Sequence, residues 1–211
     1  MPSVDFRLLL ITDRYQTRGR SLSTVVHEAL LGGLPALQIR ERDALTRELI
    51  GLSQQIQAMT VGRTVPLLMN DRIDLVLALD LAGVHLRRDS LPVPVARRLL
   101  GAQRLIGLST HSLEEVRRAN HDGADYVVFG PIFETPSKKE FGPPLGVQAL
   151  ESACRESRIP VFAIGGVTTG RVPAVRRAGA HGVALISAIL SHEDVAAATT
   201  ELLAALQEKF L

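Results

Sequence analysis

The sequence is poor in cysteine and carries almost no net charge. Its one cysteine, Cys154, excludes an internal disulfide and a zinc site built from cysteines, and it suggests a reducing compartment. The 24 basic and 22 acidic residues leave a net charge of +2, a field too weak to indicate a nucleic-acid partner. No stretch approaches the length of about 18 uninterrupted apolar residues that a membrane span requires, so we expect none.

Aromatic residues are also scarce, with no tryptophan, two tyrosines and six phenylalanines, so the core must be built from aliphatic side chains. An apolar fraction of 46% in 211 residues allows a sizeable core and excludes a disordered chain. The segment from Met1 to Arg7 lacks the layout of a signal peptide. Together with the single cysteine, this indicates a cytoplasmic protein.

Short apolar runs alternate with amphipathic stretches along the whole chain. The runs are Leu8–Thr12, Ala36–Arg40, Val65–Asn70, Gly83–Arg87, Leu105–Thr110, Tyr126–Gly130, Val161–Gly166 and Gly182–Ser187. Continuous runs of Val, Ile and Leu are typical of parallel strands that are buried on both faces. Strict alternation permits an open doubly wound sheet or a closed barrel. Eight units favour an α/β fold of the (β/α)8 TIM-barrel type, with residues 1–211 forming one domain.

In such a barrel, the active site is built from residues at the carboxyl ends of the strands. Polar residues gather at those positions: Gln38, Arg40, Arg42, Asn70, Asp71, Arg87, Asp89, Ser90, Ser109, Thr110, His111, Thr135, Ser137, Lys138, Gly165, Gly166 and Ser187. Cations outnumber acids among them, which favours a phosphorylated ligand. The irregular stretch Pro131–Gly146 is expected to be an active-site loop.

Two short segments suit a phosphate group. Gly165 and Gly166 close the seventh predicted strand, while Ile186 and Ser187 close the eighth. Glycines there let backbone N–H groups approach an anion, and a following helix N-terminus adds a positive dipole end. A tight turn also requires glycine, so the position within the barrel is what favours phosphate binding.

Nine segments, taken in order, resemble the thiamine phosphate synthase superfamily over nearly the whole chain. They are Gln38–Arg42, Met69–Ile73, Gly83–Leu86, Gly107–Ser112, Gly123–Tyr126, Phe129–Phe133, Thr135–Lys138, Ala163–Gly166 and Gly179–Val183. The resemblance implies a (β/α)8 barrel that binds a phosphorylated thiazole at the ends of strands seven and eight. It also implies a homodimer. The small net charge and the lack of a long apolar run indicate neither nucleic acid nor a membrane as a partner.

Within the superfamily, the sequence resembles the thiazole tautomerase (TenI) type more closely, on the segments Ile39–Arg42, His111–Glu115 and Phe133–Lys139. This implies an isomerase that aromatises a carboxythiazole phosphate ylidene by proton transfer, with His111 as the catalytic proton carrier and no cofactor. A histidine suits that role because its ordinary pKa lies near neutral pH. The substrate-binding residues are then expected to be Gln38, Arg40, Arg42, Asn70, Ser109, Thr135, Ser137, Lys138, Gly165, Gly166, Ile186 and Ser187.

The alternative is thiamine phosphate synthase, a transferase that couples hydroxymethylpyrimidine diphosphate to thiazole phosphate and releases pyrophosphate. That enzyme type holds Mg²⁺, and the retained Asn70-Asp71 pair makes Asp71 a possible metal ligand. The pattern departs at two places. Arg42 stands where the synthase pattern has lysine, and Ser90 stands where it has aspartate, with Asp89 one residue early.

A third reading is a non-catalytic sensor or regulator that binds a phosphorylated ligand without turnover. Structural roles also compete with the catalytic ones. His111 precedes a helix and suits a surface histidine, Asn70 suits a helix cap, and Asp71 suits the positive end of a helix dipole. His85, inside the fourth predicted strand, is expected to be a core histidine with its hydrogen bonds satisfied.

Overall fold

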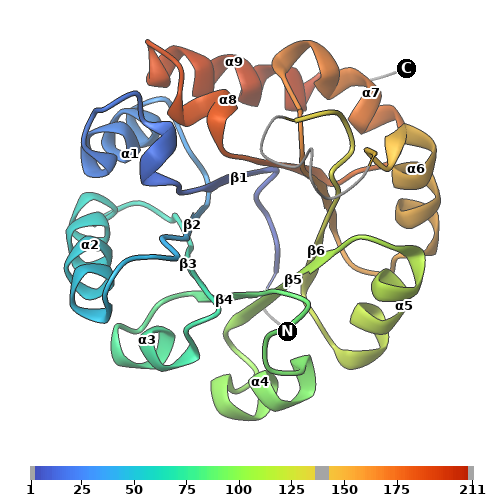
Figure 1. Ribbon diagram of the computed structural model, residues 1–211, viewed down its shortest axis with the longest axis horizontal. Helices are drawn as coiled ribbons and strands as arrows, with labels where there is room; N and C mark the ends of the chain where they lie inside the picture. The colour runs from blue at the N-terminus through green and yellow to red at the C-terminus, as the bar shows by residue number, and fades with distance from the viewer. Residues whose placement is uncertain (1–2, 136–142, 209–211) are drawn as a thin grey trace.

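The computed structural model describes residues 3–135 and 143–208. Eight parallel strands close into a barrel in chain order, so the predicted (β/α)8 fold is confirmed (Figure 1). The strands are β1 (Leu8–Ile11), β2 (Leu37–Ile39), β3 (Leu67–Asn70), β4 (Gly83–Leu86), β5 (Leu105–Thr110), β6 (Tyr126–Phe129), β7 (Val161–Ala163) and β8 (Gly182–Leu185). Pairing of β1 with β8 completes the ring.

Helices surround the barrel on the outside (Figure 1). They are α1 (Leu22–Leu31), α2 (Thr46–Met59), α3 (Ile73–Ala78), α4 (Val93–Leu100), α5 (Leu113–Asp122), α6 (Gly146–Glu156), α7 (Val172–Arg177), α8 (Ser187–Leu190) and α9 (Val195–Gln207). Short 3₁₀ turns, η1 (Arg14–Gln16) and η3 (Thr169–Arg171), precede α1 and α7. Within the described residues, no helix has the length and apolarity that crossing a membrane requires.

The apolar core has two parts, as expected where strands are buried on both faces. The larger part lies between the strands and the helices and includes Val25, Val84 and Leu202. The smaller part fills the barrel with Phe6, Leu9, Ile11, Ala36, Leu68, Leu105, Tyr126, Val128, Phe162 and Ala184. Because side chains alternate along a strand, the inward row continues from Leu68 to Asn70 and from Leu105 to Ser109. The interior is thus apolar at one end and polar at the carboxyl ends of the strands.

Candidate active site

An amide pair lies at the polar end of the barrel. Gln38 on β2 donates from Nε2 to Oδ1 of Asn70 on β3, at 3.1 Å. Gln38 is only 1% exposed, and its Oε1 atom is buried without a hydrogen-bond partner among the described residues. A buried acceptor of this kind is costly to leave unpaired. The pair therefore holds one buried acceptor that has no partner among the described residues.

Two arginines follow β2 along the chain. Arg40 is half-buried, and its backbone N–H donates to Oγ1 of Thr12 at 2.8 Å. Burial, together with the neighbouring charge of Arg42, lowers the pKa of Arg40 below its ordinary value. Arg42 lines a cavity of about 230 Å³ that also reaches Asn70 and Arg87. Positive charge is thus concentrated at the barrel mouth, as an anionic ligand requires.

Two carboxylates meet at one guanidinium group beside that cavity. The Nη2 atom of Arg87 lies 3.2 Å from Oδ2 of Asp71 and 3.3 Å from Oδ2 of Asp89. Asp71 follows β3 with a backbone φ of +67°, whereas Asp89 follows β4. Ser90, at the position where the synthase pattern has aspartate, uses its hydroxyl to accept from the Arg87 backbone N–H at 2.7 Å. Asp89, one residue early in the pattern, thus reaches the same guanidinium group as Asp71.

This pair of carboxylates fits Mg²⁺ when phosphate oxygens complete the ligand set. Magnesium commonly uses one or two carboxylates together with phosphate oxygens and water. Asp71 and Asp89 already share one cation, so the negative charge that a metal would neutralise is present at one point. No group of three or more His, Cys, Asp or Glu side chains forms a ready-made cage in the described part of the chain. The residues thus suit a metal that arrives with its phosphorylated substrate.

His85, Tyr126 and Ser109 line the barrel interior next to the amide pair. The two ring nitrogens of His85 lie 3.0 Å from the Tyr126 hydroxyl oxygen and 2.9 Å from Oγ of Ser109. His85 is buried with both nitrogens bonded, as expected for a core histidine. Burial lowers its pKa to about 3, and the charge of Arg40 acts in the same direction. The ring is therefore neutral at physiological pH.

His111 lies outside the barrel interior, in the turn before α5. Its backbone N–H donates to Oε2 of Glu115 at 2.6 Å, and its ring Nδ1 is 3.5 Å from the same oxygen. The side chain is 47% exposed. Ser112 caps α5 by accepting from the Glu115 backbone N–H, but Glu115 reaches back to His111 rather than to Ser112. The contacts of His111 are those of a helix N-terminus.

The predicted phosphate segment lies where β7 and β8 end. Gly165 and Gly166 both have positive φ, at +93° and +62°. A Cβ atom on Gly165 would lie 2.5 Å from Cβ of Pro131, so only glycine allows the start of the long loop to pack here. Ile186 and Ser187 stand at the N-terminus of α8, as expected.

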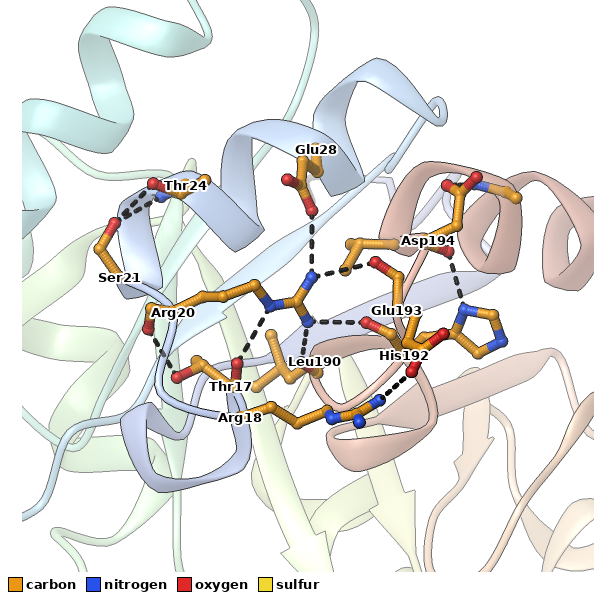
Figure 2. Close-up of polar contacts among 12 residues, drawn as sticks. Thr17, Arg18, Arg20, Ser21, Thr24, Glu28, Leu190, His192, Glu193 and Asp194 are labelled. Atoms are coloured by element: carbon orange, nitrogen blue, oxygen red, sulfur yellow. Dashed lines mark hydrogen bonds and ion pairs between the residues drawn. The ribbon is translucent and has the colours of Figure 1, made fainter.

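Arginine side chains that the sequence analysis did not single out hold this region in place. Arg171 donates to the carbonyl oxygen of Gly166 at 2.6 Å and lies 4.7 Å from the ring centre of Phe133. From the other side, Arg20 donates to the carbonyl oxygens of Leu190 and His192, at 3.0 and 2.7 Å (Figure 2). A cation is favourable at the C-terminal end of a helix such as α8. Sequence alone gives no signal for these roles, because the partners are backbone atoms.

Part of the long loop belongs to the described structure. Its two ends are held together, since the backbone N–H of Leu145 donates to the Pro131 carbonyl at 2.8 Å and that of Gly146 to the Ile132 carbonyl at 3.2 Å. Thr135 is the last described residue before the gap and is half-buried. The predicted site residues Ser137 and Lys138 lie outside the described residues.

Comparison with known proteins places this geometry in a family. The sequence model described as thiamine monophosphate synthase matches residues 8–189. A putative thiamine-phosphate synthase from Geobacter sulfurreducens is 46% identical over 92% of this chain and 91% of its own length. A thiamine-phosphate synthase from Chloroflexus aurantiacus is 42% identical over 99% of this chain and 97% of its own. The solved structure of a thiamine phosphate pyrophosphorylase from Pyrococcus furiosus has a TM-score of 0.86 at 35% identity, covering 95% of both chains.

These relatives overturn the tautomerase interpretation, because they are named as synthases. That interpretation gave weight to the segments around Arg42 and His111 and too little to the retained Asn70-Asp71 pair. The proton-carrying role of His111 was inferred for the isomerase reaction alone, so it is not carried over. The match over residues 8–189, together with relatives that are similar along nearly their full length, shows that this chain belongs to the thiamine monophosphate synthase family.

Proposed function

We propose that this protein is a thiamine phosphate synthase, which joins hydroxymethylpyrimidine diphosphate to thiazole phosphate and releases pyrophosphate. The observation that carries the proposal is the convergence of Asp71 and Asp89 on the guanidinium group of Arg87 beside the rim cavity. A proton-transfer enzyme has no need of this arrangement. A diphosphate that leaves with a divalent cation does need it.

The reaction breaks the bond between the pyrimidine methylene carbon and a diphosphate oxygen. The same carbon then bonds to the thiazole ring nitrogen, which contributes its lone pair. That nitrogen carries no hydrogen, so the step requires no general base. The main task of the protein is to stabilise the departing negative charge and to hold the two rings in contact. An exposed His111 is consistent with that division of work.

Asp71 and Asp89 are the residues that would hold Mg²⁺, and the metal would supply charge neutralisation at the diphosphate. Arg87, whose planar guanidinium group contacts both carboxylates, would donate to diphosphate oxygens of the substrate. Arg40 and Arg42 add positive charge on the neighbouring side of the mouth.

The remaining predicted residues are assigned to the two rings and to the thiazole phosphate. Gln38 and Asn70 face the pyrimidine, where the open Oε1 atom of Gln38 accepts from a donor on that ring. Ser109 on β5 bonds to His85, which is paired with Asn70 in the strand register. The residues assigned to the thiazole phosphate are Gly165, Gly166, Ile186 and Ser187, and the loop residues Thr135, Ser137 and Lys138 complete the set.

The test is direct. The purified protein is incubated with both substrates and MgCl₂, and thiamine phosphate and pyrophosphate are measured over time. We expect the two products to form in equal amounts and their formation to stop when the metal is chelated. A folded preparation that forms neither product would contradict the proposal.

A further inference from the structure

A chain of hydrogen bonds leads from the closed centre of the barrel to its mouth. The Tyr126 hydroxyl lies 3.0 Å from Nδ1 of His85, and Nε2 of His85 lies 2.9 Å from Oγ of Ser109. Tyr126 and His85 are 0% and 2% exposed, whereas Ser109 is only partly buried. The chain thus begins in the core and ends at the candidate site.

Gly107 makes this contact possible. The strand register pairs His85 with Gly107 and Gly107 with Tyr126, so β5 separates the two side chains. A Cβ atom on Gly107 would lie 2.1 Å from Cζ of Tyr126 and 2.6 Å from Nδ1 of His85. The missing side chain leaves the space in which the phenol and the imidazole meet.

Both buried groups keep a fixed protonation state. The buried ring of His85 faces two hydroxyl oxygens and, within the described residues, pairs with no carboxylate, so the ring is neutral and carries one N–H group. Burial raises the pKa of Tyr126 above its ordinary value, so the hydroxyl keeps its hydrogen. The single ring proton of His85 is therefore on Nδ1 or on Nε2, and the neighbours decide which.

The hydrogen bonding of Tyr126 favours a proton on Nε2 of His85. Nδ1 of His85 is the one hydrogen-bond partner of the Tyr126 hydroxyl within the residues that the structure describes. A proton on Nδ1 would make the phenol oxygen an acceptor and leave its buried O–H group without an acceptor, which is unfavourable. With the proton on Nε2, Tyr126 donates to Nδ1 and His85 donates to Ser109. Every polar hydrogen of the buried pair is then used.

We infer that Tyr126 and His85 are positioning residues that orient the hydroxyl group of Ser109. Because the Ser109 oxygen accepts from His85, its own hydrogen points away from the ring and toward the barrel mouth. There Ser109 donates to an acceptor atom of the substrate. The identity of that substrate rests on the proposed function. The order of donors and acceptors from Tyr126 through His85 to Ser109 rests on the contacts alone.

The decisive measurement is the tautomer of His85 in the free protein. Histidine is labelled with ¹⁵N, and long-range ¹H–¹⁵N correlation spectra are recorded at neutral pH, with His85→Asn used to assign the signals. We expect a protonated Nε2 and an unprotonated Nδ1. A protonated Nδ1, an equal mixture, or a charged ring would overturn the inference. None of these readouts depends on turnover, so a failure of this inference can be distinguished from a failure of the proposed function.

Variants of the two tyrosines provide a matched control. Tyr126→Phe removes the donor to Nδ1, so the Nδ1 resonance should shift as it loses its hydrogen bond. The exposed Tyr15 bonds to Asp43 in the loops outside the barrel interior, and Tyr15→Phe should leave the His85 signals unchanged. Equal shifts in the two variants, or no shift in either, would contradict the assigned contact.

Synthase kinetics then test whether Tyr126 acts through Ser109. Tyr126→Phe should lower kcat roughly 3- to 10-fold in the wild-type background, the effect expected for one lost hydrogen bond. In a Ser109→Ala background, the same change should lower kcat by less than about 2-fold, because the group that it orients is gone. Equal losses in both backgrounds would show that Tyr126 acts by another route.

Discussion

Asp71 and Arg87 form an ion pair across the ends of two neighbouring strands, with Oδ2 of Asp71 3.2 Å from Nη2 of Arg87. Both residues line the rim cavity. Because the same guanidinium also contacts Asp89, the proposed Mg²⁺ would have to compete with Arg87 for both carboxylates. The proposed metal site is therefore best tested at Asp71.

Replacing Asp71 with asparagine should remove a metal ligand while keeping the size of the side chain. We expect kcat/KM to fall by roughly 100-fold and the Mg²⁺ concentration needed for half-maximal rate to rise. Asp74→Asn is the matched control, because Asp74 pairs with Arg72 on the exposed side of α3. It should change the rate by less than about 2-fold. An unaltered metal requirement in Asp71→Asn would remove Asp71 from the metal site.

Arg20 should matter more for stability than its neighbour Arg18. Arg20→Met leaves the carbonyl groups of Leu190, His192 and Glu193 without their donor, which should lower the free energy of unfolding by about 1–3 kcal/mol. Arg18 makes one exposed ion pair with Glu193 (Figure 2), so Arg18→Met should cost less than about 1 kcal/mol. Urea unfolding of the two variants measures the difference. Equal losses would mean that the carbonyl contacts of Arg20 are replaced by water at no cost.

Two glycine-to-alanine changes should have opposite signs. Gly107→Ala forces a methyl group into Tyr126 and His85, and overpacking of this kind typically costs about 1–3 kcal/mol or more. Gly51 lies within α2 with open space around its Cβ position, so Gly51→Ala should stabilise the protein by about 0.5–1 kcal/mol. Thermal and urea unfolding report both changes. A stable Gly107→Ala variant would show that the barrel interior rearranges to accommodate the added methyl group at little cost.

The buried His85 should make the protein sensitive to mild acid. Its pKa is lowered to about 3 in the folded state, against an ordinary value of 6.5, so the unfolded chain binds the extra proton between these values. Stability is therefore fully present above about pH 6.5 and is lost as the pH falls toward 3. The loss is about 1.4 kcal/mol per pH unit at most.

The matching experiment compares urea unfolding at pH 7 and pH 5. By pH 5, His85 should account for about 2 kcal/mol of lost stability, and His85→Asn should lose less than the wild type over this interval. His121 is exposed, and its ring pairs with the neighbouring Asp122, so His121→Asn should behave like the wild type. The same pH dependence in all three proteins would assign the acid sensitivity to other groups.

The barrel could be predicted from the sequence because each strand is marked by a short local pattern of apolar residues. A buried strand such as Leu8–Ile11 is a continuous apolar run, and polar residues follow at the carboxyl ends of the strands. Contacts across the barrel were not predictable in this way. The approach of Tyr126 to His85 depends on strand register and on the empty space at Gly107, neither of which is written in any single segment.

The choice between the two activities failed for a related reason. His111 stands in a motif that resembles the tautomerase type, yet the polar contacts that the structure gives it are with Glu115 at the start of α5. Asp89 stands one residue early in the sequence pattern, yet its carboxylate reaches the same guanidinium group as Asp71. A shift of one position along a loop is decisive in an alignment, but a side chain of ordinary length spans it easily.

The pairing of β1 with β8 brings Leu8 beside Val183 and closes the ring with residues from opposite ends of the chain. Further bonds tie the same ends together, from Ser191 to the Gln16 carbonyl at 2.7 Å and from His181 to the Phe6 carbonyl at 3.0 Å. Such long-range contacts form slowly because a large loop must close first. During translation, β1 has no permanent neighbour on this side until β8 has left the ribosome. A nascent chain that stalls before that point exposes two open sheet edges, where chaperones or other strands can bind.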